Sequence, residues 1–368
     1  MQKYDKYDII IENITKEISS MIDNNENKKW ETPEYSKSEI NKAGKIISDE
    51  NSSNQDRNNA INVLNNWRAS HAYPLQVICS NLRRTNSNAI VVQRLKRLES
   101  ILGKIKRFPE MQLYKMQDLG GCRVILNNIE QVYASVERYK KSRIRHILKR
   151  EYDYIKNPKS SGYRSYHMVY QFHSDKKDTY NKNMLIEIQF RTKLQHIWAT
   201  AVEMMGIYTN TNLKSSQGND DILRFFTLIS SVFAIKEGCP VCPNTSDDIV
   251  ILKKEIQTLD RQYKIISTLK GLNVAINYDE TKIKRNKKGY YILTLDYAKK
   301  ILNIKFFQPS QTELATRVYG EIEKKENINV VLVSANSFTT LRAAYPNYFV
   351  DIAEFINIAK TLIVDNEN

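Results

Sequence analysis

The chain has 368 residues, of which 41% are hydrophobic and 26% are charged, so it can bury one or two cores. This composition excludes a disordered or fibrous protein. The formal net charge of +15 is unevenly distributed, because residues 60–173 hold 21 Lys and Arg against 7 Asp and Glu, whereas residues 220–368 hold 20 against 18. Such a concentrated excess predicts a polyanionic partner: a nucleic acid, a nucleotide or an acidic membrane.

The membrane is the least favoured of these partners. The longest apolar stretch, FFTLISSVFAI (225–235), is too short to span a bilayer. The first 20 residues carry acidic side chains throughout, unlike a signal peptide.

Four cysteines are too few for a disulfide framework in a chain of this length. We therefore expect a cytoplasmic protein with no membrane partner.

The first half of the chain is predicted to begin with helices. Residues 1–58 are polar and helical, ending in an exposed loop over 48–58, and a helix over about 59–82 is kinked or broken at Pro74. Apolar residues then recur at helical spacing over 91–108. On an ideal helix Arg94, Arg97 and Lys104 share a face, whereas Lys96 lies on the opposite face. This position of Lys96 indicates that the helix starts only after Lys96.

Between residues 119 and 192 the hydrophobic period changes to two, which predicts strands over 121–126, 163–172 and 184–192. In MLIEIQFRT (184–192) the apolar residues alternate with polar ones, so the strand presents Glu187, Gln189 and Arg191 on one face. An amphipathic helix is expected over 194–208.

A polar linker is predicted over 210–220, followed by a smaller α+β module. Its expected helices cover 221–235, 247–270, 311–325 and 350–363, and its expected strands cover 271–278, 289–296, 303–307 and 329–334. The fold class is therefore α+β, a mixed sheet flanked by helices, with three regions: 1–58, 59–215 and 216–368.

No glycine-rich phosphate loop is present, so side chains must bind any nucleotide. The basic residues over 94–107 are candidates, although a solvated basic face is the more usual explanation of such a run. Asp118 and Glu187 are candidate Mg²⁺ ligands, with ordinary salt bridging as the alternative. Cys239 and Cys242 form a C-x-x-C pair that lacks two further zinc ligands. The basic loop that ends in Tyr163 could clamp phosphates and stack on a base.

Together, these segments resemble the RelA/SpoT alarmone synthetase family. The resemblance rests on RLKRLESILGK (94–104), MQDLGGCR (116–123), DYIKNPKSSGYRSYH (153–167) and EIQFRTKLQHIWA (187–199), in the family's order. It implies a synthetase-type mixed sheet and the Mg²⁺-dependent transfer of the β,γ-pyrophosphate of ATP to a ribose 3′-hydroxyl.

The resemblance also implies roles for individual residues. Asp118 and Glu187 would hold Mg²⁺, and Glu187 would take the proton from the attacking hydroxyl. Tyr163 would stack on the acceptor base. The remaining ATP-binding residues would be Arg94, Lys96, Lys104 and Arg123, and the remaining acceptor-binding residues Lys156, Lys159, Arg164, His167, Gln189, Arg191 and His196.

Within this family, NNWRASHAYPL (65–75) and the C-terminal region are similar to the CapRel-like fused toxin–antitoxin synthetases. That resemblance implies a pseudo-zinc-finger module and a regulatory Tyr345-x-x-Tyr348 element. The alternative is that the two tyrosines only pack against the start of a helix. The implied function is pyrophosphorylation of the 3′-CCA end of tRNA in anti-phage defence, with the C-terminal region silencing the enzyme until a phage protein binds. A (p)ppGpp synthetase using GDP or GTP, and an inactive fold serving as a binding module, stay open as alternatives.

Overall fold

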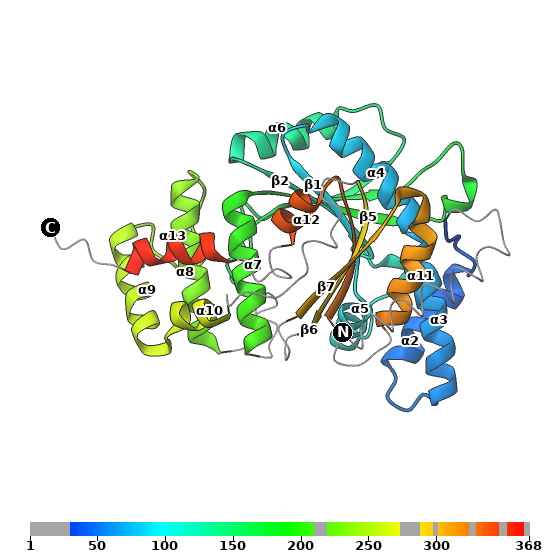
Figure 1. Ribbon diagram of the computed structural model, residues 1–368, viewed down its shortest axis with the longest axis horizontal. Helices are drawn as coiled ribbons and strands as arrows, with labels where there is room; N and C mark the ends of the chain where they lie inside the picture. Colours follow the sequence, from blue (N-terminus) through cyan, green and yellow to red (C-terminus); the bar gives the residue numbers. More distant parts are fainter. Residues whose placement is uncertain are drawn as a thin grey trace, which may run out of the picture.

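The computed structural model describes residues 30–209, 219–272, 288–296, 301–323, 329–345 and 352–363 (Figure 1). The strands are β1 (Ile90–Leu95), β2 (Gly120–Leu126), β3 (Ile147–Asp153), β4 (Tyr166–Gln171), β5 (Leu185–Thr192), β6 (Gly289–Asp296), β7 (Ile301–Phe307) and β8 (Asn329–Ala335). The helices are α2 (Lys37–Ser48), α3 (Asn54–Ser70), α4 (Ala72–Thr85), α5 (Leu98–Arg107), α6 (Ile129–Lys140), α7 (Lys193–Tyr208), α8 (Asp220–Lys236), α9 (Ile249–Tyr263), α10 (Ile265–Leu272), α11 (Thr312–Glu323), α12 (Phe338–Ala344) and α13 (Ala353–Ile363).

All of these strands belong to one sheet, in the order β3-β4-β5-β2-β1-β8-β6-β7. β2 and β5 run parallel and every other neighbouring pair is antiparallel, so the sheet is mixed as predicted. The C-terminal strands do not form a sheet of their own, because β8 pairs with β1 through Gln93 with Ser334 and Arg94 with Val333. The region predicted as a separate module, 216–368, thus extends the sheet of the region before it.

Helices cover both faces of this sheet (Figure 1). α4, α6 and α11 pack on one face, where the alternate residues Ile186, Ile188 and Phe190 of β5 are fully buried. α7 and α12 pack on the other face, where Val92 and Ile125 share an apolar core with Val333 of β8. This second face also carries the polar residues of β5, so a hydrophobic layer and a polar site lie side by side on it.

The N-terminal helices end and begin where the sequence supplies caps. Ser36 forms a capping box with Glu39 at the start of α2, and Ser53 caps α3. α3 and α4 break at His71, three residues before Pro74, which fits the predicted interruption. Burial lowers the pKa of His71 to about 4, so its ring is a neutral packing group against Trp67.

α8, α9, α10 and α13 form a helical layer beside α7 (Figure 1). The predicted helix over 247–270 is two helices, because Lys264 adopts a left-handed φ of 53° between α9 and α10. Of the predicted strand over 271–278, residues 271 and 272 belong to α10 and the others lie outside the described residues. The predicted linker 210–220 also lies largely outside them.

Several predicted elements differ from the structure. The helix in the run over 91–108 starts at Leu98, after Lys96 as indicated, but the residues before it form β1, so Arg94 does not share a helix face with Lys104. Cys79 of α4 and Cys122 of β2 form a disulfide, a single bridge where the cysteine count argued against a disulfide framework. Among the described residues, no helix has the length and apolarity needed to cross a bilayer.

Candidate active site

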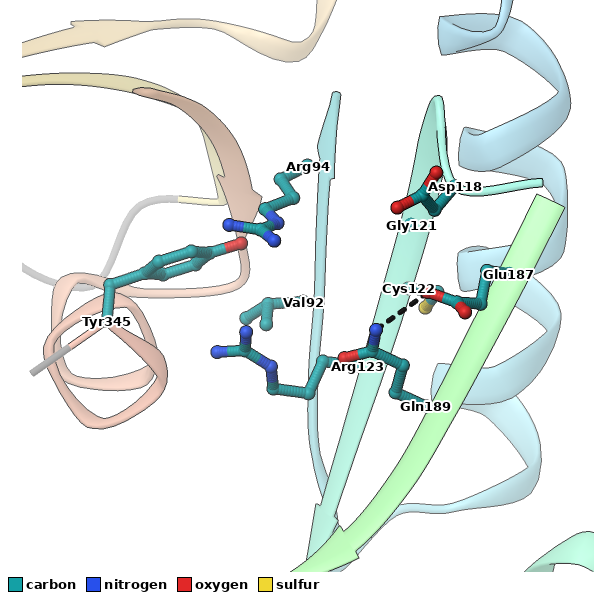
Figure 2. Close-up of a pocket in the computed structure, with 9 residues that line it drawn as sticks. All are labelled: Val92, Arg94, Asp118, Gly121, Cys122, Arg123, Glu187, Gln189 and Tyr345. Carbon is teal, nitrogen blue, oxygen red and sulfur yellow. Dashed lines mark hydrogen bonds between the residues drawn. The ribbon is translucent and has the colours of Figure 1, made fainter. Parts of the chain in front are cut away.

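Three neighbouring strands and one C-terminal residue enclose a pocket on the face covered by α7 and α12 (Figure 2). The register places Arg94 of β1 beside Gly121 of β2, and Gly121 beside Glu187 of β5. Because Gly121 has no side chain, the space between the other two stays open. The lining residues are Val92, Arg94, Asp118, Gly121, Cys122, Arg123, Glu187, Gln189 and Tyr345.

Asp118, just before β2, pairs with both lysines that were predicted to bind ATP. Its Oδ2 accepts a hydrogen bond from Lys96 Nζ at 2.8 Å, and its Oδ1 accepts one from Lys104 Nζ at 3.0 Å. Burial raises the pKa of Asp118, but the two ammonium groups outweigh burial and hold the pKa far below its usual range. This side of the pocket therefore carries more positive than negative charge, which suits a polyphosphate.

Glu187 lies mid-strand on the polar face of β5, as the alternation predicted. His167 Nδ1 lies 2.9 Å from its Oε1, and Gln189 Nε2 donates a hydrogen bond to its Oε2 at 2.7 Å. Burial raises the pKa of Glu187, but the charge and hydrogen bond of His167 outweigh it and lower the pKa. The carboxylate is thus ionised at neutral pH, and both of its oxygens are held in position.

His167 links Glu187 to the predicted acceptor-stacking residue, because its Nε2 lies 2.9 Å from the Tyr163 hydroxyl. Burial lowers the pKa of His167, but Tyr163 and Glu187 outweigh it and raise the pKa to about 9. Burial raises the pKa of Tyr163, while His167 and Arg191 bring it down to about 8. At neutral pH a protonated His167 therefore bridges the two groups and fixes the Tyr163 ring relative to Glu187.

The turn before β4 needs a glycine. Gly162 has a φ of +86°, and a Cβ there would lie 2.9 Å from Trp198. The Gly162 amide donates to the Lys159 carbonyl at 2.9 Å, and this turn places Lys159 Nζ 5.5 Å from the centroid of the Tyr163 ring. A cation and an aromatic face thus lie together at the end of the basic loop, and His167 links the Tyr163 hydroxyl to Glu187.

Three guanidinium groups gather on the other side of the pocket. Arg123 Nη1 donates to the Ala344 carbonyl, and Arg191 Nη2 donates to Gln189 Oε1, each at 3.1 Å. Burial, together with the like charges of Arg191 and Arg94, lowers the pKa of Arg123 to about 9. In the described part of the chain, Nε of Arg123 and of Arg191 is buried without a hydrogen-bond partner. Crowded cations with unused donors favour an anion such as phosphate.

Tyr345, the residue after α12, lies against this arginine cluster (Figure 2). Its side chain is 3% exposed, and the Arg123 guanidinium lies 5.7 Å from its ring centroid. Its hydroxyl is 3.4 Å from the Gln93 carbonyl, a long hydrogen bond. The C-terminal region therefore contributes an aromatic wall to the pocket. Tyr348, the second predicted regulatory residue, lies outside the described residues.

Three other predicted acceptor-binding residues, Lys156, His196 and Arg164, are not among the residues that line the pocket. Lys156 is exposed, with Nζ 5.1 Å from the Tyr133 ring centroid, and His196 Nε2 lies 3.1 Å from the Ala343 carbonyl. The prediction that Arg164 binds the acceptor is corrected, because its guanidinium is buried away from the pocket. It donates hydrogen bonds to Ser230 Oγ, the Ile155 carbonyl and Cys242 Sγ.

The donor atoms fit magnesium better than zinc. Within the described ranges, no three His, Cys, Asp or Glu side chains come together, and buried Cys242 accepts from Arg164 rather than facing a metal. Asp118 and Glu187 face the same pocket with four carboxylate oxygens. Mg²⁺ commonly takes one or two carboxylates and completes its shell with water and phosphate oxygens, so this pair has the type of donor atom that the ion prefers.

Sequence reasoning did not anticipate Val92, Gly121 or Cys122 as lining residues. The signal for Val92 was present, because it lies two residues before Arg94 and a strand places such residues on the same face. The helical spacing of the apolar residues over 91–108 concealed this relation, because no strand was predicted before the helix.

The family model covers the residues that line this pocket except Val92 and Tyr345. Residues 93–213 match the family model described as "Region found in RelA / SpoT proteins". The chain is 34% identical over 112 residues to GTP pyrophosphokinase YjbM of Bacillus subtilis, a match that covers 30% of this chain and 52% of that protein. It is 27% identical over 169 residues to GTP pyrophosphokinase YwaC of the same organism, covering 44% and 72%. The chain thus spans about half the length of the first relative.

A solved structure is also similar: the small alarmone synthetase 1 from Bacillus subtilis bound to its product pppGpp. The TM-score is 0.39 at 23% identity, and the match covers 47% of this chain and 90% of that one. The residues that match the RelA/SpoT model, 93–213, include Asp118, Tyr163 and Glu187.

Proposed function

We propose that the protein is a pyrophosphokinase that transfers the β,γ-pyrophosphate of ATP to a ribose 3′-hydroxyl. The observation that carries this proposal is the arrangement of one pocket, in which Asp118 and Glu187 face the guanidinium group of Arg94. Transfer of a phosphoryl group asks a protein mainly for cations, alignment and one base, and the pocket has all three.

In this mechanism the acceptor 3′-oxygen forms a bond to the β-phosphorus of ATP, and AMP leaves with the bridging oxygen. Arg94, Lys96, Lys104 and Arg123 hold the triphosphate. Glu187 takes the hydroxyl proton, for which its lowered pKa keeps it ready in the ionised form. Asp118 and Glu187 would hold a Mg²⁺ ion, which supplies charge neutralisation on the phosphates when bound.

We propose the 3′-CCA end of tRNA as the acceptor. The supporting observation is exposed positive charge at the edge strand β3, at Lys149 and Arg150, and in the segment before it, at Arg143 and at Arg145, which pairs with Asp175. A free nucleotide needs only a local pocket, whereas a folded RNA benefits from distributed cations. GDP or GTP is the second candidate acceptor, because the similar proteins are named GTP pyrophosphokinases.

We further propose that the C-terminal region restrains the enzyme, as in the CapRel-like fused toxin–antitoxin synthetases. Support comes from Tyr345, which fills one side of the pocket and contacts Arg123, a proposed ATP ligand. A phage protein that binds only the open form would release activity during infection by its differential affinity. The inactive-fold alternative is disfavoured because Asp118, Glu187 and Tyr163 are all present around one site.

The test is incubation of the full-length protein with γ-³²P-ATP and Mg²⁺, in parallel with bulk tRNA, GDP and GTP. Labelling of tRNA alone supports the proposed acceptor, and labelling of GDP or GTP alone replaces it with the second candidate. Because the wild-type protein is proposed to be restrained, the Tyr345→Ala protein is assayed beside it. If neither protein labels any acceptor, the transfer function itself is refuted.

A further inference from the structure

A row of aromatic rings continues outward from Tyr163, away from the pocket. The Tyr154 ring contacts His167 edge-on, with centroids 5.2 Å apart, and lies 6.2 Å from Tyr163. The Tyr152 ring stacks on Tyr154 with centroids 5.6 Å apart and planes only 2° from parallel. The mechanism proposed above uses neither Tyr152 nor Tyr154.

The register shows that this row lies on the same face of the sheet as the pocket. Tyr152 of β3 pairs with His167 of β4, which pairs with Gln189 of β5. Directly paired residues project from the same face, so Tyr152 stands two strands outward from Gln189. β3 is an edge strand, and a bound chain leaving the pocket over it meets no further strand.

Cations accompany the rings. Lys159 Nζ lies 4.5 Å from the Tyr154 centroid and 5.5 Å from the Tyr163 centroid, so one ammonium group bridges the two rings. Lys149 and Arg150, just before Tyr152 on β3, are both exposed. An anionic backbone that passes from Tyr163 toward the sheet edge would therefore meet positive charge along its whole path.

The neighbouring acids do not oppose this path. Glu151 alternates to the other face, where it pairs with Lys140 at 2.7 Å. Asp153 also lies on that face, accepts a hydrogen bond from Tyr133, and caps the amides of Ile155 and Lys156. One face of the Tyr152 ring is covered by Tyr154. In the part of the chain that the structure describes, no other ring or cation lies over Tyr152.

We propose that Tyr152, supported by Tyr154 and Lys159, is a second base-binding platform for a single-stranded RNA 3′ end. Tyr163 takes the terminal base, and Tyr152 stacks on a base one or two nucleotides before it, while Lys159 contacts the phosphate between them. The proposal rests on the proposed RNA acceptor and adds to it a recognition element that a mononucleotide cannot use. Stacking on an aromatic side chain tolerates any base, so the platform measures length of RNA rather than sequence.

The test compares two fluorescent RNA tetranucleotides, ACCA and the same chain with abasic riboses at both cytidine positions. Binding is measured by fluorescence anisotropy with the full-length wild-type protein, Tyr152→Ala and Tyr152→Phe. Tyr263→Ala, which removes a half-buried tyrosine at the end of α9, is the matched control. Thermal unfolding of each variant checks that the fold is retained.

The wild-type protein is expected to bind ACCA about 5- to 150-fold more tightly than the abasic RNA, the range typical of one lost base–aromatic stack. Tyr152→Ala should lose this preference and bind both RNAs like the wild type binds the abasic one. Tyr152→Phe and Tyr263→Ala should keep it. A wild-type protein that binds neither RNA or both equally, or a Tyr152→Ala variant that keeps the preference, overturns the platform.

Transfer from γ-³²P-ATP to ACCA, measured with the same proteins and with Tyr345→Ala, separates this proposal from the one on which it rests. Base-dependent binding without transfer by any of these proteins refutes RNA as the acceptor and leaves the platform in place. Transfer to ACCA with base-independent binding leaves the acceptor in place and refutes the platform.

Discussion

Replacing Tyr345 by alanine should activate the enzyme in the absence of any other protein. The ring is 3% exposed and lies between the end of α12 and the arginine cluster, so its removal weakens the covered state of the pocket. Burying a large aromatic side chain contributes about 2–3 kcal/mol. The contact with the Arg123 guanidinium adds about 0.5–1 kcal/mol, and the long hydroxyl contact with Gln93 adds little.

A loss of about 3 kcal/mol corresponds to a change of about 150-fold in the equilibrium between covered and open pocket. If the wild-type pocket is covered about 99% of the time, which needs about 2.7 kcal/mol, the variant is covered about 40% of the time. Basal transfer should then rise about 60-fold. Because the cover contacts the proposed ATP ligands, the apparent KM for ATP should fall as the open fraction rises.

The assay is the initial rate of label transfer from γ-³²P-ATP to the acceptor with purified full-length protein. Tyr345→Phe is the matched control, because it keeps the ring and removes only the long hydroxyl contact, so its rate should stay within about twofold of wild type. Thermal unfolding establishes that both variants are folded. A folded Tyr345→Ala protein as inactive as the wild type, while an added acceptor still binds, would refute the view that Tyr345 covers the site.

The remaining predictions concern the catalytic groups and pH. Glu187→Gln should lower kcat by about two to four orders of magnitude as expected for loss of a general base, and a rate within tenfold of wild type would remove Glu187 from the mechanism. Tyr163→Ala should raise the acceptor KM about 5- to 150-fold and spare the ATP KM, and the reverse pattern would reassign the loop to ATP. His167 has a pKa raised from 6.5 to about 9, so its contribution to the free energy of unfolding is complete below about pH 6.5 and is lost as pH rises through 9. Glu187 has a lowered pKa, so its contribution is present above about pH 4.5 and is lost as pH falls further. Urea unfolding of the wild type and of His167→Gln is compared at pH 5.5, 7 and 9.5. The free energy of unfolding of the wild type should fall toward that of the variant only at the highest pH. A difference between the two proteins that stays constant with pH would contradict the ion pair between His167 and Glu187.

Local alternation predicted the part of the site that lies on β5. In Leu185–Thr192 the apolar residues fill one face of a central strand, so Glu187 and Gln189 had to project from the other. A strand that is buried on one face leaves this pattern in the sequence because its environment repeats every two residues. The same reasoning failed for β3, since its residues from Ile147 to Glu151 are exposed at the sheet edge and show no alternation.

Where two periods overlap, the sequence alone was ambiguous. Val92, Arg94 and Leu95 fit a helical stripe with Leu98 as well as they fit a strand that ends at Leu95. The pairing of β1 with β2 along its whole length, and with β8 through two residues, decides between them, and partners that lie elsewhere in the chain leave no local signal. The acceptor-binding role of Arg164 was wrongly predicted for another reason. Arg164 directly follows Tyr163, and neighbouring residues of an extended chain point in opposite directions.

The pairing of β1 with β8 also limits how the pocket can open. A rigid-body departure of residues 216–368 would break the contacts of Gln93 with Ser334 and of Arg94 with Val333, and would expose the core that Val92 shares with β8. Opening is therefore expected to be local, at the end of α12, where Tyr345 and the Ala344 carbonyl contact Arg123. For the same reason a protein that ends at residue 215 should aggregate or unfold rather than act as the active enzyme that removal of a merely silencing region would leave, because the edge of β1 that pairs with β8 and an apolar face are both exposed. Size-exclusion chromatography with a transfer assay decides the matter, and a monomeric, active 1–215 protein would show that the C-terminal strands are a detachable cover.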